Sequence, residues 1–82
     1  SQQDTELAAR LASLSPQQFR VLTLVARGLL NKQIADRLEV QERTVKAHLS
    51  AIFERLGVRN RTQAGVVLRE LELSDPSRQL EA

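Results

Sequence analysis

Hydrophobic residues recur along most of the chain at the three- and four-residue spacing of an amphipathic α-helix. Only three glycines and two prolines interrupt this pattern, and all of them except Gly65 stand where a helix should begin or end. The pattern therefore predicts an all-α, four-helix bundle-like domain. Its helices are expected to run from 16 to about 27, from 30 or 31 to 38, from 42 to 56, and from 60 to 71 or 73.

Upstream of these helices, Leu7, Leu11 and Leu14 are also at helical spacing. This predicts that residues 1–13 are a linker or a short extra amphipathic helix. The four helices then form one domain over residues 14–73, and residues 74–82 are expected to be a C-terminal tail.

Two helix starts carry recognisable capping sequences. Ser15, with Pro16 after it and Gln18 three residues on, reads as an N-cap and capping box, and Asn60 with Gln63 reads as a second one. Leu14 and Phe19 stand at the two positions of a hydrophobic staple. The apolar residues of the first domain helix are expected to form one buried face made of Phe19, Leu22, Val25 and Ala26, which Val21 and Leu24 widen.

The helices over 30–38 and 42–56 are separated by three residues, Glu39, Val40 and Gln41, which is the arrangement of a helix-turn-helix. Ala35 is small enough to let the two helices cross closely, and Val40 can fill the turn between them. Projection of the longer helix at about 100° per residue separates two stripes. The stripe predicted to be buried holds Val45, Leu49, Ile52 and Leu56, and the opposite, exposed stripe holds Arg43, Lys46, Ala47, Ser50 and Glu54.

The net charge of +2 conceals an uneven distribution. Residues 15–69 carry ten cations against four anions, while both ends of the chain are acidic. A basic middle favours a polyanionic partner such as nucleic acid, although charge alone fits a solvated helix face equally well.

The residue types present exclude several other kinds of protein. With no cysteine and a single histidine, His48, the chain offers neither a disulfide framework nor a metal cluster, and no catalytic constellation or phosphate-cradling glycine loop is found. We therefore expect no enzyme, no cofactor and no catalytic residue. The absence of a long apolar run predicts a cytoplasmic protein. His48 lies at the edge of the buried stripe, either as a packed, hydrogen-bonded residue or as a phosphate contact.

Three short segments occur in order at a specific spacing: NKQIA from Asn31, TVKAH from Thr44, and LGV from Leu56 followed by NRTQA from Asn60. With these segments, residues 14–68 resemble the LuxR-type helix-turn-helix domain of bacterial transcription regulators. The resemblance implies sequence-specific binding of double-stranded DNA by a homodimer, with the third helix of the domain in the major groove. It also implies an N-terminal sensory domain in relatives, as in response regulators, and makes RNA polymerase a candidate partner.

The resemblance also implies roles for individual residues. The positions that match the base contacts of the family are Lys46, Ala47 and Ser50. Those that match its phosphate contacts are Asn31, Lys32, Arg43, Thr44, Arg59 and Arg61. Gly65 and Val66, on the outward face of the last helix, match its dimerisation surface.

The chain departs from the family at three positions. Leu30 and Gln41 stand where many relatives have an N-capping serine, and Glu39 stands where a glycine often turns the chain. We expect Asn31 to cap its helix one residue late, Gln41 to be a poor cap, and the turn at Glu39 to be strained or slightly altered. The alternative interpretation is a helical protein-interaction module whose basic face docks an acidic partner, with weak DNA binding that lacks sequence preference.

Overall fold

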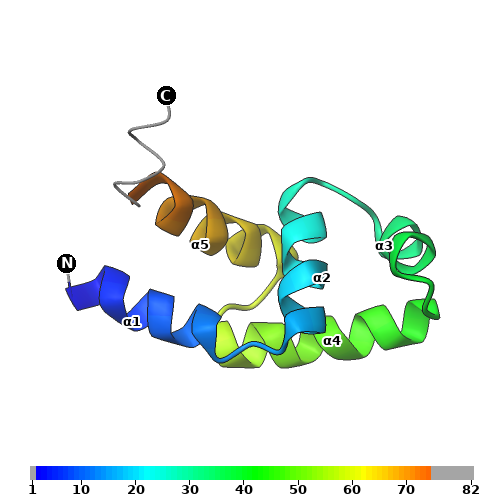
Figure 1. Cartoon of the computed structure of the whole chain (residues 1–82), viewed down its shortest axis with the longest axis horizontal. Coiled ribbons are helices and arrows are strands. Elements are labelled where there is room, and N and C mark those ends of the chain that lie inside the picture. Colours follow the sequence, from blue (N-terminus) through cyan, green and yellow to red (C-terminus); the bar gives the residue numbers. More distant parts are fainter. Residues whose placement is uncertain (1, 75–82) are drawn as a thin grey trace.

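The computed structural model describes residues 2–74, and these residues form five helices and no strand (Figure 1). The helices are α1 (Gln2–Ala12), α2 (Pro16–Ala26), α3 (Asn31–Leu38), α4 (Glu42–Leu56) and α5 (Arg61–Ser74). The predicted all-α fold and the extra N-terminal helix are both confirmed. Apart from Ser74, the C-terminal tail expected over 74–82 lies outside the described residues.

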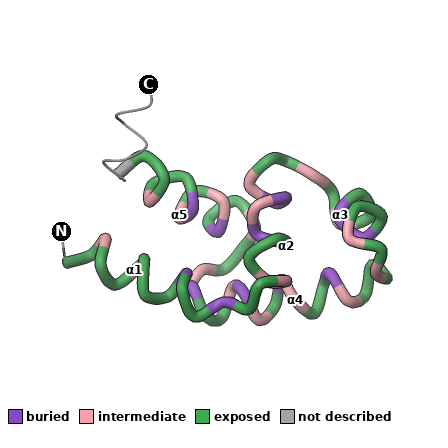
Figure 2. The backbone as a smooth tube through the Cα atoms, viewed as in Figure 1, coloured by how far each residue is buried: buried purple, intermediate pink, exposed green. Residues whose placement is uncertain are grey.

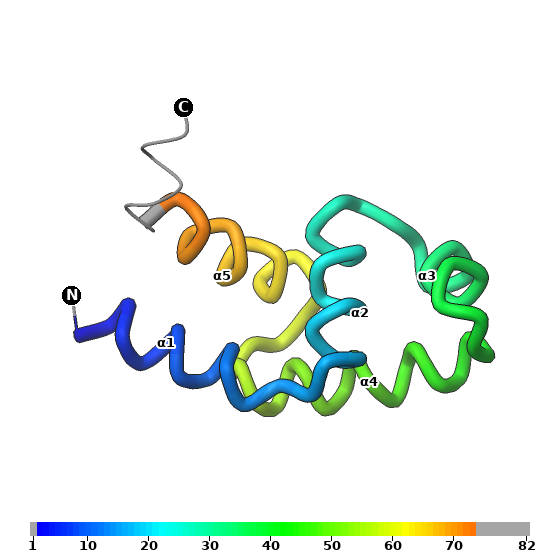
Figure 3. The backbone as a smooth tube through the Cα atoms, viewed as in Figure 1, coloured from blue at the N-terminus to red at the C-terminus, as the bar shows by residue number. Residues whose placement is uncertain are grey.

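Helix α2 stands at the centre of the domain and packs against α3, α4 and α5 (Figure 1). Figure 3 shows α1 and α5 on one side of α2 and α3 on the other. Within α2, Val21 and Leu22 are completely buried, and Leu24 and Val25 are nearly so. Burial of this apolar face is the main source of stability for helices too short to persist alone.

The prediction that Phe19 belongs to the buried face of α2 is wrong, since its side chain is 41% exposed. The buried stripe of α2 is centred between Val21 and Val25, because the helix is covered by neighbours on that side. At 100° per residue, Phe19 lies about 140° away from that centre. The bundle, rather than the local spacing, sets the rotation of α2.

Both predicted N-caps form. The Ser15 hydroxyl accepts a hydrogen bond from the Gln18 N–H at 3.1 Å, and the Gln18 side chain accepts one from the Ser15 N–H at 2.9 Å, which completes the capping box. At the start of α5, Asn60 Oδ1 accepts from the Gln63 N–H at 2.9 Å. The Gln63 side chain, however, accepts from the N–H of Arg59 and not from that of Asn60.

Helix α1 is docked onto the domain by two arginines. Arg10 Nη1 donates to the Leu56 carbonyl at 3.2 Å, and the Arg55 guanidinium donates to the Ser13 carbonyl, so each side chain reaches across to the other segment. Leu11 and Leu14 are buried in the same core as α4. Cations at helix C-terminal carbonyls are favourable, and this pair fixes the end of α1 to the end of α4.

Candidate nucleic-acid interface

The two stripes predicted for α4 are confirmed. Val45 and Ile52 are completely buried, and Leu49 and Leu56 are nearly so. The opposite stripe is exposed and is formed by Arg43, Lys46, Ala47, Ser50 and Glu54. Figure 2 shows this alternation of buried and exposed backbone along α4, which runs past α2 toward α3. The core therefore fixes the rotation of α4, and that rotation turns short and basic side chains outward.

The turn before α4 combines a packed residue, Val40, with a strained backbone conformation at Glu39. Val40 is half-buried against the core, and its N–H donates to the Ala35 carbonyl at 3.0 Å. Glu39 adopts the left-handed conformation, with φ of 58° and ψ of 44°. A residue with a side chain is strained there by about 1–2 kcal/mol, so the expected strain at Glu39 is confirmed.

The start of α4 lacks a side-chain cap, as expected. Gln41 occupies the N-cap position, but its side chain accepts no hydrogen bond from the first turn. Arg43 and Lys46 are exposed there and make no hydrogen bond or ion pair with any residue in the described range. The first two turns of α4 thus present Arg43 and Lys46 beside one anion, Glu42, and no side chain caps the first N–H groups.

The start of α3 is built differently, and the prediction that Asn31 caps it is wrong. Leu30 has the extended ψ of 158° that marks the N-cap, which places Asn31 inside the first turn. The Leu30 N–H donates to Gln33 Oε1 at 2.8 Å, which supplies half of a capping box. The Asn31 side chain turns instead toward α5, where its Oδ1 accepts from Arg61 Nη1 at 2.6 Å.

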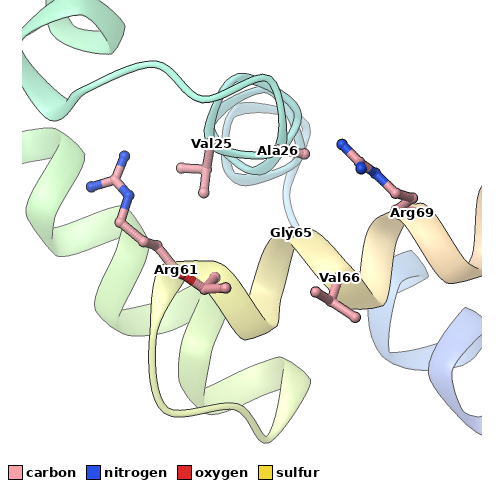
Figure 4. A pocket seen from close by; sticks show the side chains of 7 residues that line it. Val25, Ala26, Arg61, Gly65, Val66 and Arg69 are labelled. Atoms are coloured by element: carbon pink, nitrogen blue, oxygen red, sulfur yellow. The ribbon is translucent and has the colours of Figure 1, made fainter.

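Arg61 forms a second bond at the same place. Its Nη2 donates to the Leu29 carbonyl at 2.7 Å, so one guanidinium joins the start of α5 to the connection between α2 and α3. Figure 4 shows the side chain extended from α5 past Val25. Arg61 and Asn31 are half-buried, whereas Lys32 and Arg59 are exposed. Of the residues predicted to contact phosphates, Asn31 and Arg61 are therefore hydrogen-bonded to each other.

Gly65 and Val66, the residues predicted for dimerisation, face different surroundings. Val66 is 48% exposed, but a Cβ atom added to Gly65 would lie 3.5 Å from the Ala26 Cα of α2. Gly65 thus lies against its own chain. Both residues line a shallow groove between α2 and α5, with Arg61 toward one end and Arg69 toward the other (Figure 4).

His48 is half-buried and makes no hydrogen bond with the described residues. Its side chain is thus partly packed, but the hydrogen bond expected for it is not formed with those residues. Within residues 2–74, no three His, Cys, Asp or Glu side chains come together in a way that could hold a metal ion. None of the described helices is long and apolar enough to cross a membrane.

Comparison with known proteins agrees with this geometry. The family model for bacterial regulatory proteins of the luxR family matches residues 12–68. The chain is 46% identical over 66 residues to the DNA-binding transcriptional activator DevR/DosR of Mycobacterium tuberculosis, a match that covers 80% of this chain and 30% of that protein. It is 50% identical over 54 residues to the glycerol metabolism activator of Pseudomonas putida, with 66% of this chain and 24% of that protein covered.

A third relative is the nitrate/nitrite response regulator protein NarL of Escherichia coli, 40% identical over 53 residues, with 65% of this chain and 24% of that protein covered. The chain spans less than a third of the length of these curated relatives. No solved structure gives a significant match. The matched segment includes the whole helix-turn-helix and the exposed stripe of α4. The chain belongs to the luxR family of bacterial regulatory proteins and contains its helix-turn-helix DNA-binding domain.

Proposed function

We propose that this domain binds double-stranded DNA sequence-specifically as a homodimer, with α4 in the major groove, and regulates bacterial transcription. The observation that carries the proposal is the exposed stripe of α4, which has Arg43 and Lys46 near the start of the helix and lies opposite a buried stripe. The name of the mycobacterial relative, a DNA-binding transcriptional activator, supports it. The proposal places the protein in the bacterial cytoplasm, with RNA polymerase as a candidate partner of the longer regulator.

Base recognition is assigned to Lys46, Ala47 and Ser50, which are exposed on successive turns of α4. The Lys46 ammonium can donate to the O6 and N7 acceptors of guanine, and the Ala47 methyl group can contact the methyl group of thymine. Ala47 and Ser50 have short side chains, so the helix backbone can approach the base edges closely.

Phosphate contacts are assigned to residues around this stripe. Arg43 and Thr44 lie in the first turn of α4, Lys32 lies in the first turn of α3, and Arg59 precedes α5. Asn31 is also assigned to the phosphate contacts. The resemblance to the family adds Arg61, whose side chain is bonded to Asn31. The uncapped first turns of α3 and α4 support this assignment, because N–H groups at a helix start favour an anionic oxygen.

A titration of the chain with a mixed-sequence duplex at low and moderate salt tests DNA binding residue by residue. Amide shifts clustered at 31–33, 43–50 and 59–61 are the expected result, and selection from random DNA then gives the operator. Shifts that are absent or confined to 64–73 would refute the proposal and favour the acidic protein partner instead.

Dimerisation is assigned to the exposed face of α5 around Val66. On an operator with two half-sites about one helical turn apart, two copies should bind together. Val66→Glu should leave the monomer folded but reduce the two-to-one complex, as measured by sedimentation with the selected operator. Ala8→Glu, which adds the same charge on the exposed side of α1, is the matched control. An unchanged two-to-one complex for Val66→Glu would rule out this face.

A further inference from the structure

The Arg61 guanidinium uses two of its nitrogens inside the protein. Nη1 donates to the Asn31 side chain at 2.6 Å and Nη2 to the Leu29 carbonyl at 2.7 Å, and both contacts are partly buried. The fork geometry of arginine fits two acceptors at once, which a lysine ammonium cannot reproduce. Arg61 thus spans from α5 to the start of α3, across a sequence separation of 30 residues.

This contact also fixes the chemical polarity of Asn31. A guanidinium only donates hydrogen bonds, so the Asn31 carboxamide must turn its oxygen toward Arg61. Its NH₂ group, with two donors and no acceptor, is left on the other side and makes no hydrogen bond with the described residues. A phosphate oxygen only accepts hydrogen bonds, so this orientation is the one that suits DNA.

We infer that Arg61 is a positioning residue for DNA binding, which acts by holding the Asn31 carboxamide and the adjoining connection rather than by contacting a phosphate itself. The inference rests on the proposed function, since it concerns how that same surface is prepared for DNA. In this arrangement the Asn31 side chain contacts the DNA, and the positive charge of Arg61 makes no direct contact with a phosphate. Arg59, which is exposed and has no internal side-chain bond, is the contrasting case of a direct contact.

Charge and geometry are separated by comparing Arg61→Lys with Arg27→Lys, at an exposed arginine whose side chain makes no bond with the described residues. Both variants keep one positive charge, but only the first breaks a two-acceptor fork. Affinity for a labelled mixed-sequence duplex is measured across a salt series with the whole 82-residue chain, and circular dichroism checks the fold. Arg61→Lys should weaken binding by about two- to tenfold at every salt concentration, while Arg27→Lys, at a residue outside the proposed interface, binds as the wild type does.

The salt dependence gives a second, independent readout. Arg59→Ala should lower the slope of log affinity against log salt by about 0.9, the loss of one phosphate contact, whereas Arg61→Lys leaves that slope unchanged. In an Asn31→Ala background, Arg61→Lys should cost less than it does in the wild type, because the contact with Asn31 is already gone and only the bond to the Leu29 carbonyl remains. Wild-type affinity for Arg61→Lys, or an equal cost in both backgrounds, would overturn the inference.

A measurement on the wild-type chain removes any dependence on how the variants fold. The side-chain amide signals of Asn31 should shift when the duplex is added, and unshifted signals would overturn the inference. Failure of the wild-type chain to bind the duplex at any salt is a separate result, which would overturn the proposed function and with it this inference.

Discussion

The starts of α3 and α4 both lack a capping side chain, yet the protein supports them in different ways. At α3, Gln33 accepts from the Leu30 N–H, and Arg61 holds both Asn31 and the Leu29 carbonyl. At α4, the Gln41 side chain caps nothing, and Arg43 and Lys46 make no bond with the described residues. One helix start is tied to the rest of the domain, and the other is left open.

This difference shows that one domain can have a helix start whose polar groups are bonded to other elements and another whose polar side chains are left for a ligand. The open start of α4 leaves the Arg43 and Lys46 side chains available to a ligand, and the position of the helix is secured by its buried stripe. The shorter α3 has only Ile34 and Ala35 fully buried, so it gains more from polar ties at its beginning. We propose that α3 holds the DNA backbone while α4 reads the bases.

The largest expected effect comes from removing the anchor of α3. Ile34 is completely buried, so Ile34→Ala should lower the free energy of unfolding by about 2–5 kcal/mol through lost burial and a cavity. Urea denaturation followed by circular dichroism measures this. Leu30→Ala, at a side chain that is 65% exposed, should change stability by about 0.5 kcal/mol or less. Equal losses for the two variants would show that α3 is not anchored through Ile34.

The next effect separates the two proposed roles in DNA binding. Lys46→Ala should reduce affinity for the selected operator by about 1–3 kcal/mol and weaken discrimination against random DNA, because a base contact is lost. Lys32→Ala should weaken both duplexes alike and lower the salt slope by about 0.9. Titrations of both variants against operator and random duplexes provide the comparison. An equal loss on the two duplexes for Lys46→Ala would contradict base reading.

A residue with a capping side chain at the N-cap of α4 should stabilise the start of this helix. Gln41→Ser supplies a side-chain acceptor for the first turn and should raise the free energy of unfolding by about 0.5–2 kcal/mol. Chemical denaturation measures the gain, with Gln41→Ala as the control that removes the side chain without adding an acceptor. No difference between these two variants would show that the first turn of α4 gains nothing from a cap.

The smallest expected effect tests the local tie at α3. Gln33→Ala removes the acceptor for the Leu30 N–H and should cost about 0.5–1.5 kcal/mol of stability. Gln41→Ala removes a side chain of the same type that bonds nothing and should be nearly neutral. Parallel thermal melts of the two variants compare the helix starts directly, and similar losses would mean that the two starts do not differ.

Much of the fold follows from local sequence signals. The bounds of α2 to α5 agree with the spacing of apolar residues to within a few residues, and the Ser15 box and the Asn60 cap form as predicted. The buried and exposed stripes of α4 also follow from periodicity alone. The interaction of Gln33 with Leu30 could have been predicted too, since a glutamine at the third helical position is half of a capping box.

Other features had no local signal. The exposure of Phe19 depends on which side of α2 the other helices cover. The spacing of apolar residues in α2 allowed more than one face of the helix to be the buried one. The Arg10 and Arg55 bonds to backbone carbonyls join segments more than 40 residues apart, and every arginine in the sequence is an equal candidate for such a role.

The sequence by itself determined the helices, the caps at Ser15 and Asn60 and the side of α4 that turns outward, because each depends on residues within a few positions of one another. Only the tertiary structure decided that Asn31 faces Arg61 rather than capping α3, that Gly65 lies against Ala26, and that α1 is docked to the end of α4. These are contacts through space between separate elements. Their partners are chosen when the hydrophobic core fixes how the helices cross, and a pattern read along the chain does not contain that information.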